Sequence, residues 1–158
     1  MHHTDKTGYL KIICFEMNHE PFAIPVQNIR EVNRMVHLQK IKKAQPYVLG
    51  LINYHGCLTP VLDLRMLINS EPSILTQKSL WIAVNYGQDS VCLVVESIRG
   101  FMNIDLKNLC SMPTLVQAKH IDFLLYFAKM NQEFIPIIDV TKLLSVKEKQ
   151  ILVSMVTE

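Results

Sequence analysis

Six histidines and four cysteines are the side chains of this 158-residue chain best suited to bind a metal or to act as a base or nucleophile. The histidines show no HExxH spacing, and no two cysteines lie close enough in sequence to suggest a zinc or redox motif. The five glycines form no GxGxxG or GxxxxGK phosphate loop, and no serine stands in a GxSxG motif. We therefore predict a protein that is not an enzyme and that needs no metal or cofactor.

One segment, from Gly50 to Gly56, could form a binding site. Its glycines bracket a strand end and a tight turn, so Asn53 and His55 are expected to project from that turn. Glu31 would form a polar pair with His55 if the two lie together, and a polar pair flanked by exposed apolar residues is typical of a protein interface. An ordinary hairpin turn whose polar side chains face water is the simpler interpretation.

Composition and charge restrict the function further. Hydrophobic residues make up 49% of the chain and charged residues 19%, which predicts a dense apolar core with some apolar binding surface. The 16 basic and 14 acidic residues are spread along the chain, so there is no basic stripe for nucleic acid. No apolar run approaches the length of about 18 residues that a membrane-spanning helix needs. The first eleven residues are too polar for a secretory signal, which predicts a cytoplasmic protein.

The cysteines agree with a reducing compartment. They are far apart in the sequence and mostly stand in apolar runs, so we predict buried, reduced thiols. The four positions are Cys14, Cys57, Cys92 and Cys110.

Short apolar segments rich in Val, Ile, Leu and aromatic residues, separated by small polar clusters, predict many short strands. The expected strands are residues 9–17, 21–25, 48–53, 57–62, 79–86, 90–95, 100–104, 123–130 and 133–138. Short helical turns are expected at 64–68 and 140–144. A capping box beginning at Ser145 predicts a C-terminal helix that reaches Met155.

An internal repeat is the most informative pattern. Residues 47–68 align with residues 123–144, and residues 22–32 align with residues 91–101. A proline and an aspartate recurring in register argue against a chance likeness between two amphipathic segments. We predict two small barrels of about five strands each, packed together with a groove between them. The matched positions are Pro60 with Pro136, Asp63 with Asp139, Leu67 with Leu143, and Ile29-Arg30 with Ile98-Arg99.

With the motifs PVQNIREV, YVLGLINYHGCLTPVLDLR and IPIIDVTKLL, the chain resembles a CheW-like domain from about Tyr9 to its end. The resemblance implies a mainly β fold of two intertwined five-stranded SH3-like β-barrels, with short helices and a C-terminal helix. Residues 9–158 would form this domain, as two barrel subdomains, and residues 1–8 a flexible N-terminus. The positions that match the family's central turn and the segment after it are Gly50, Ile52, Asn53, Gly56, Pro60, Asp63, Leu64 and Arg65.

The resemblance also implies a function, that of a non-enzymatic adaptor in chemotaxis. Such proteins couple the cytoplasmic tip of a methyl-accepting chemoreceptor to a histidine kinase of the CheA type, and they reach the membrane only through the receptor. By this similarity a receptor helix would dock in the groove between the barrels. The implied groove residues are Ile29, Glu31, Gly50, Asn53, His55 and Gly56, and Pro60, Asp63 and Arg65 belong to the structural motif.

Departures from the family pattern leave alternatives open. His55 replaces the family's turn arginine, the second repeat lacks the usual glycine before its turn, and Ser97 follows Glu96 where Asp-Gly is common. An adaptor of an accessory pathway, such as pilus-driven surface motility, is one alternative. A sensory module that binds a small ligand between the barrels is a second. A hydrolase that uses Asp63, Glu31 and His55 is a third.

Overall fold

A computed structural model describes residues 8–111, 123–144 and 148 of the chain. Most of these residues lie in short strands. The strands are β1 (Tyr9–Met17), β2 (Glu20–Pro25), β3 (Ile29–Arg34), β4 (Val48–Tyr54), β5 (Cys57–Asp63), β6 (Leu80–Tyr86), β7 (Asp89–Val95), β8 (Ser97–Asp105), β9 (Leu109–Cys110), β10 (Leu124–Met130) and β11 (Glu133–Ile138). The helix α1 (Leu64–Asn69) and the 3-10 helices η1 (Val26–Asn28), η2 (Leu106–Asn108) and η4 (Val140–Lys142) connect them.

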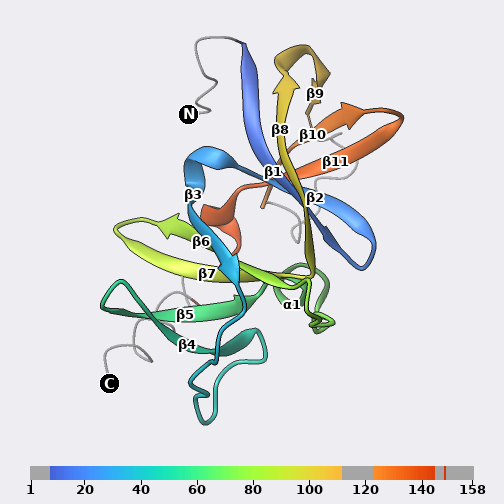
Figure 1. The fold of residues 1–158 in the computed structure, drawn as a ribbon. Coiled ribbons are helices and arrows are strands. Elements are labelled where there is room, and N and C mark those ends of the chain that lie inside the picture. The colour runs from blue at the N-terminus through green and yellow to red at the C-terminus, as the bar shows by residue number, and fades with distance from the viewer. Residues whose placement is uncertain (1–7, 112–122, 145–147, 149–158) are drawn as a thin grey trace.

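The strands form two sheets that make the upper and lower lobes of Figure 1. The six-stranded sheet has the order β8-β1-β2-β11-β10-β9, and the five-stranded sheet has the order β3-β6-β7-β5-β4. β3 leaves the upper lobe to pair with β6 below, while β8 leaves the lower lobe to pair with β1 above (Figure 1). Each sheet is therefore built from strands of both halves of the chain, as the predicted intertwining requires.

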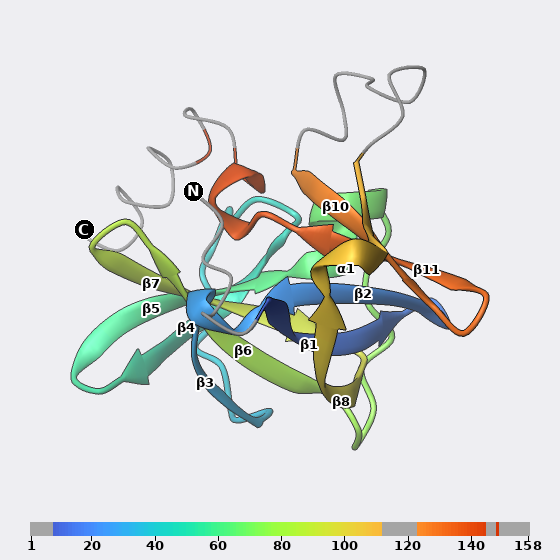
Figure 2. The same ribbon diagram turned by 90° about the horizontal axis from the view of Figure 1, so that it is seen from above.

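The internal repeat is visible in the pairing of the strands. The parallel pair of β5 with β7 joins Val61 to Cys92, and the parallel pair of β11 with β2 joins Ile137 to Ala23. These two pairs are equivalent under the alignment of the repeats. The hairpins β4–β5 and β10–β11 correspond in the same way, and their turns point to opposite sides of the molecule (Figure 2).

The matched aspartates make the same contacts in both repeats. The amide of Asp63 donates to the carbonyl of Tyr47 at 2.8 Å, and the amide of Asp139 donates to the carbonyl of Phe123 at 2.6 Å. Each aspartate then caps the helical turn that follows it, because its carboxylate accepts a backbone amide of the first turn. The expected short helices after both aspartates are thereby confirmed, the second as the 3-10 helix η4.

The core is divided into three clusters. One packs between the two sheets, and each of the other two is enclosed by a single sheet. Strand β1 shows why its sequence is a continuous apolar run rather than an alternating one: Ile12 and Cys14 face the cluster enclosed by the six-stranded sheet, while Ile13 and Phe15 face the cluster between the sheets. Burial on both faces leaves little room in β1 for polar side chains.

Several expectations need correction. The upper sheet has six strands instead of five, because the two-residue strand β9 pairs with β10. Strand β3 was not expected, since four of its six residues are Arg, Glu, Asn and Arg. The prediction of buried thiols is wrong for Cys57 and Cys110, which are exposed. It is right for Cys14 and Cys92, and burial raises the pKa of the Cys92 thiol to about 12.

Two expectations fall outside the described residues. These are the flexible N-terminus at residues 1–8, of which only Gly8 is described, and the C-terminal helix from Ser145, of which only Glu148 is described. Within the described ranges no helix is long and apolar enough to cross a membrane.

Candidate functional site

A polar pair lies at the end of the five-stranded sheet where the β4–β5 hairpin turns. The imidazole Nε2 of His55 is 3.2 Å from a carboxylate oxygen of Glu31, which projects from β3. The two residues are 24 positions apart in sequence, and β3 and β4 are the opposite edge strands of the five-stranded sheet. Their contact therefore shows that the sheet curls until its two edges approach each other at this end. This contact confirms the proximity expected from the sequence. His55 is largely exposed and Glu31 is half-buried.

Two aromatic residues pack between His55 and the core. The ring of Tyr54 meets the His55 imidazole edge-on at a centroid distance of 4.4 Å, and it meets the Trp81 indole edge-on at 5.8 Å. Trp81 is buried in the cluster enclosed by the five-stranded sheet, so this stack connects the exposed histidine to the core. Burial raises the pKa of the Tyr54 hydroxyl, and its hydrogen bond to the carboxylate of Glu31 raises it further.

The turn that presents His55 is rigidly built. His55 and Gly56 both have positive φ, 51° and 82°, which is typical of the turns that join tightly paired antiparallel strands. The side-chain oxygen of Asn53 accepts the amide of Gly56 at 2.9 Å. Asn53 and Gly56 therefore hold the conformation of the turn, which presents His55 to the carboxylate of Glu31 on β3.

Two of the six groove residues predicted from the sequence lie apart from this pair. Gly50 is buried, and a Cβ on it would stand 2.7 Å from the carbonyl oxygen of Gln39. This glycine is required because the chain at Gln39 bridges to β4 at that point. Ile29 is half-buried, packs against the cluster between the sheets and is opposite Val84 in register.

The predicted structural motif lies where the two lobes meet. Pro60 is buried opposite Leu51, and the carboxylate of Asp63 accepts hydrogen bonds from the amide and the hydroxyl of Ser73 as well as capping α1. The buried side chain of Arg65 donates to Glu96 at 3.3 Å and to Glu71 at 2.9 Å.

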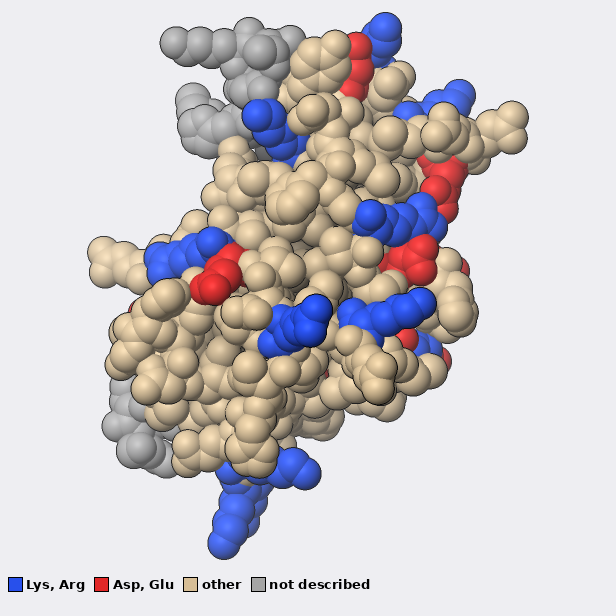
Figure 3. Space-filling model, in the orientation of Figure 1, with Lys and Arg blue, Asp and Glu red and all other residues tan. Residues whose placement is uncertain are grey.

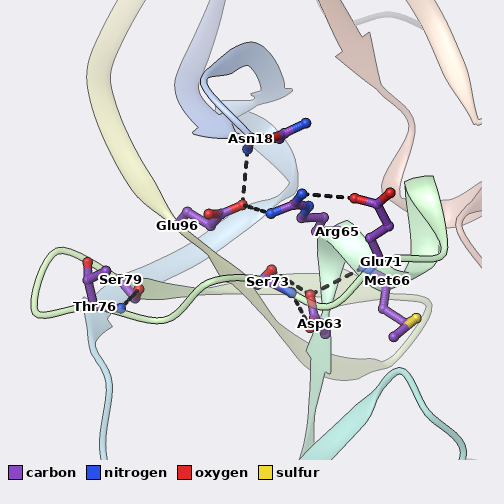
Figure 4. A network of polar contacts seen from close by, with 9 residues as sticks. All are labelled: Asn18, Asp63, Arg65, Met66, Glu71, Ser73, Thr76, Ser79 and Glu96. Carbon is purple, nitrogen blue, oxygen red and sulfur yellow. Dashed lines mark hydrogen bonds and ion pairs between the residues drawn. The ribbon is translucent and has the colours of Figure 1, made fainter.

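The Arg65 contacts join segments that are far apart in sequence. The Glu96 carboxylate that binds Arg65 also accepts the amide of Asn18, in the turn between β1 and β2 (Figure 4). A charged network thus connects a hairpin of the six-stranded sheet to α1 and to the junction of β7 with β8. We call Arg65, Glu96, Glu71 and Asn18 the interlobe network.

Sequence reasoning did not anticipate the parts played by Arg30, Tyr54 and Trp81 at the site. Arg30 follows Ile29 at an irregularity in β3, and its Nε donates to the side-chain oxygen of Asn85. The repeat contained a signal for this residue, since Arg30 aligns with Arg99. Tyr54 and Trp81 carry no motif, because their roles arise from packing between β4 and β6.

The charge distribution agrees with the balanced composition. On the face shown in Figure 3, basic and acidic side chains are interspersed, and much of the surface carries neither. Among residues 8–111, 123–144 and 148, no three His, Cys, Asp or Glu side chains gather in a way that could hold a metal ion.

Two sheets that exchange strands, with an exposed histidine on a turn and a carboxylate beside it on β3, form a surface of the kind found in protein-interaction modules. Comparison with known proteins identifies the family. The family model described as the CheW-like domain matches residues 11–148, and the chain belongs to this family. Membership confirms the prediction of a non-enzymatic chemotaxis adaptor.

Individual relatives agree with this assignment. The chain is 26% identical over 145 residues to the "Chemotaxis protein CheW" of Bacillus subtilis (strain 168), with 92% of each chain covered. It is also 26% identical over 137 residues to the "Protein FrzA" of Myxococcus xanthus, covering 85% of this chain and 84% of that protein. Its fold matches the crystal structure of the scaffolding protein TtCheW from Thermoanaerobacter tengcongensis with a TM-score of 0.80, at 24% identity, over 89% of this chain and 95% of the other.

Proposed function

We propose that this protein couples the cytoplasmic hairpin of a methyl-accepting chemoreceptor to a histidine kinase of the CheA type, and that it works in the cytoplasm. The observation that supports this most directly is the match of residues 11–148 to the CheW-like domain. Curated relatives that match about nine-tenths of the chain carry the name of a chemotaxis protein.

The receptor is proposed to bind beside the Glu31–His55 pair. His55 is largely exposed on the turn, Glu31 lies beside it on β3, and an aromatic stack backs the histidine. Together they provide a fixed polar contact beside apolar surface. A helix docking here would use its apolar side for contact area and a polar side chain to set its register. Asn53 and Gly56 would act through the shape of the turn.

Position 55 would also affect the strength of receptor binding. A guanidinium carries a permanent charge and several donors in a planar fork, whereas an imidazole has two nitrogens and a charge that depends on pH. Histidine in place of the family's arginine therefore favours a weaker contact with the receptor or a receptor with a different complementary group.

The test uses this chain with purified receptor hairpin and purified histidine kinase from the same organism. Glu31→Ala should weaken receptor binding about tenfold, because His55 loses the carboxylate that orients it. Kinase binding and thermal stability should change little, since the pair is exposed and such pairs contribute about 0–1 kcal/mol. Glu20→Ala, a change of the same type at an exposed position in the β1–β2 hairpin, is the matched control.

Two outcomes would contradict the proposal. If the folded wild-type protein binds neither partner, the adaptor function is wrong for this chain. If Glu31→Ala weakens receptor and kinase binding equally, the residue acts through the fold, and the receptor does not bind at the pair.

A further inference from the structure

The two repeats place an arginine at the same irregular position in each sheet. In β8, Ile98 is opposite Phe15 and Gly100 is opposite Cys14, so Arg99 is the extra residue between them. In β3, Ile29 is opposite Val84 and Glu31 is opposite Ala83, so Arg30 is the extra residue. The two bulges are equivalent under the repeat alignment, and the Nε of each arginine donates to a side chain of the neighbouring strand.

In the six-stranded sheet this arginine is fully engaged by carboxylates. The Nε of Arg99 donates to Glu16 at 2.7 Å, and its two Nη atoms donate to the two oxygens of Glu133 at 2.9 and 3.2 Å. Such a two-pronged pair is the strongest geometry that an arginine and a carboxylate can adopt. These hydrogen bonds raise the pKa of Arg99 and lower the pKa of Glu133.

In the five-stranded sheet the equivalent arginine, Arg30, has no carboxylate in place of either Glu16 or Glu133. The position of Glu16 is taken by Asn85, whose neutral oxygen accepts the Nε of Arg30. The position of Glu133 is taken by Cys57. Glu133 is the first residue of β11 and is opposite Met130, and Cys57 is likewise the first residue of β5 and is opposite Tyr54. Cys57 is exposed, so the place that Glu133 occupies in the other sheet is open to solvent here.

Neighbouring acidic residues do not supply Arg30 with a carboxylate partner. Glu31 is adjacent in sequence, but its carboxylate is engaged by the imidazole of His55 and by the side-chain amide of Asn33. Among the described residues no carboxylate forms an ion pair with Arg30, although the side chain is exposed and lies near enough to Tyr54 to influence its hydroxyl. Arg30 precedes Glu31 on β3, and among the described residues no hydrogen bond or ion pair engages its two Nη atoms.

We infer that Arg30 binds a carboxylate of the receptor hairpin, in the two-pronged geometry that Glu133 adopts on Arg99. This inference rests on the proposed receptor site and adds the chemistry of the partner: an Asp or Glu on the docking helix, close to the group that contacts His55. The missing carboxylate of the five-stranded sheet would thus be supplied by the partner. It would set the register of the helix, because a fork-shaped pair tolerates little displacement.

The first experiment measures binding of the purified receptor hairpin to the full chain. Arg30→Gln should weaken it about tenfold and should reduce its dependence on salt, because a charge-assisted contact is lost. Arg34→Gln, an exposed arginine on the same strand, is the matched control and should change affinity less than about twofold. Equal loss in the two variants would overturn the inference, since it would show only a general effect of positive charge.

The second experiment supplies the carboxylate within the chain. Cys57→Glu reproduces the arrangement around Arg99, so it should occupy Arg30 and weaken receptor binding about as much as Arg30→Gln does. In the Arg30→Gln background the same change should have little further effect on binding. Cys57→Gln, which matches the size without the charge, should bind the receptor several times more tightly than Cys57→Glu.

Stability provides a measurement that needs no receptor. Cys57→Glu should raise the urea midpoint of unfolding when Arg30 is present and should not raise it in Arg30→Gln. If Cys57→Glu changes the urea midpoint equally with and without Arg30, the two side chains do not meet, and the inference is overturned. If the wild-type chain binds no receptor hairpin, the proposed function and this inference both fail. If Glu31→Ala weakens receptor binding and Arg30→Gln does not, the inference alone fails.

Discussion

Removing Glu96 from the interlobe network should destabilise the protein far more than removing Glu71. The Glu96 carboxylate accepts the amide of Asn18 at 3.0 Å and a guanidinium nitrogen of Arg65 at 3.3 Å. The side chains of Glu96 and Arg65 are 17% and 8% exposed, whereas that of Glu71 is 62% exposed. Water therefore screens the ion pair of Arg65 with Glu71 much more than its ion pair with Glu96.

The magnitude follows from these exposures. A hydrogen bond that involves a charged group contributes about 1.5–3 kcal/mol, and breaking a fully buried ion pair costs about 3–5 kcal/mol. Because Glu96 keeps some contact with water, we expect Glu96→Ala to lower the free energy of unfolding by about 2–3 kcal/mol, or the Tm by roughly 5–10 °C. Glu71→Ala should cost at most about 1 kcal/mol, as exposed pairs do.

The assay is urea unfolding followed by the fluorescence of Trp81, the only tryptophan of the chain and a buried residue of the five-stranded sheet. Circular dichroism should give the same midpoint if the two lobes unfold together. Equal destabilisation by Glu96→Ala and Glu71→Ala would refute the reasoning, because it would show that burial does not separate the two ion pairs.

Three further outcomes are expected. A thiol reagent at mild alkaline pH should modify Cys57 and Cys110 quickly in the folded protein and the two buried cysteines only after unfolding, as mass spectrometry would show. Gly50→Ala should cost about 1–3 kcal/mol in urea unfolding, because its new methyl group collides with the carbonyl of Gln39. Glu133→Gln should destabilise the protein at neutral pH, where the depressed pKa of this carboxyl favours folding. The difference from wild type should shrink as the pH falls below the ordinary carboxyl range and through the folded pKa, and a constant difference would contradict this assignment.

Much of the secondary structure could be predicted from the sequence because its strands are short apolar runs separated by turn residues. β1 and β11 lie within the expected bounds, and most other strands differ by only a few residues at their ends. β3 was missed because it lies at the edge of its sheet and carries polar side chains. Local pattern does not indicate a strand whose identity comes from pairing with a distant neighbour.

The candidate site, too, could be predicted from the sequence only in part. The meeting of Glu31 with His55 could be conjectured, since Glu31 stands between two apolar residues that pack, His55 stands in a turn, and the resemblance places both in one groove. The unequal surroundings of Arg30 and Arg99 could not, because they depend on which side chains the exchanged strands bring to each bulge. The burial of Gly50 under the chain at Gln39 likewise arises from a tertiary bridge between segments that sequence periodicity treats separately.

The exchange of β3 and β8 between the sheets has a mechanical consequence. Two lobes joined by a flexible linker can swivel, but here each lobe includes strands that continue directly into the other. Rotation of one lobe against the other would break main-chain hydrogen bonds in both sheets at once, which costs far more than bending a loop. A partner held by one lobe is therefore kept at a set angle to a partner held by the other. An adaptor built in this way fixes the relative orientation of its two partners as well as holding them close together.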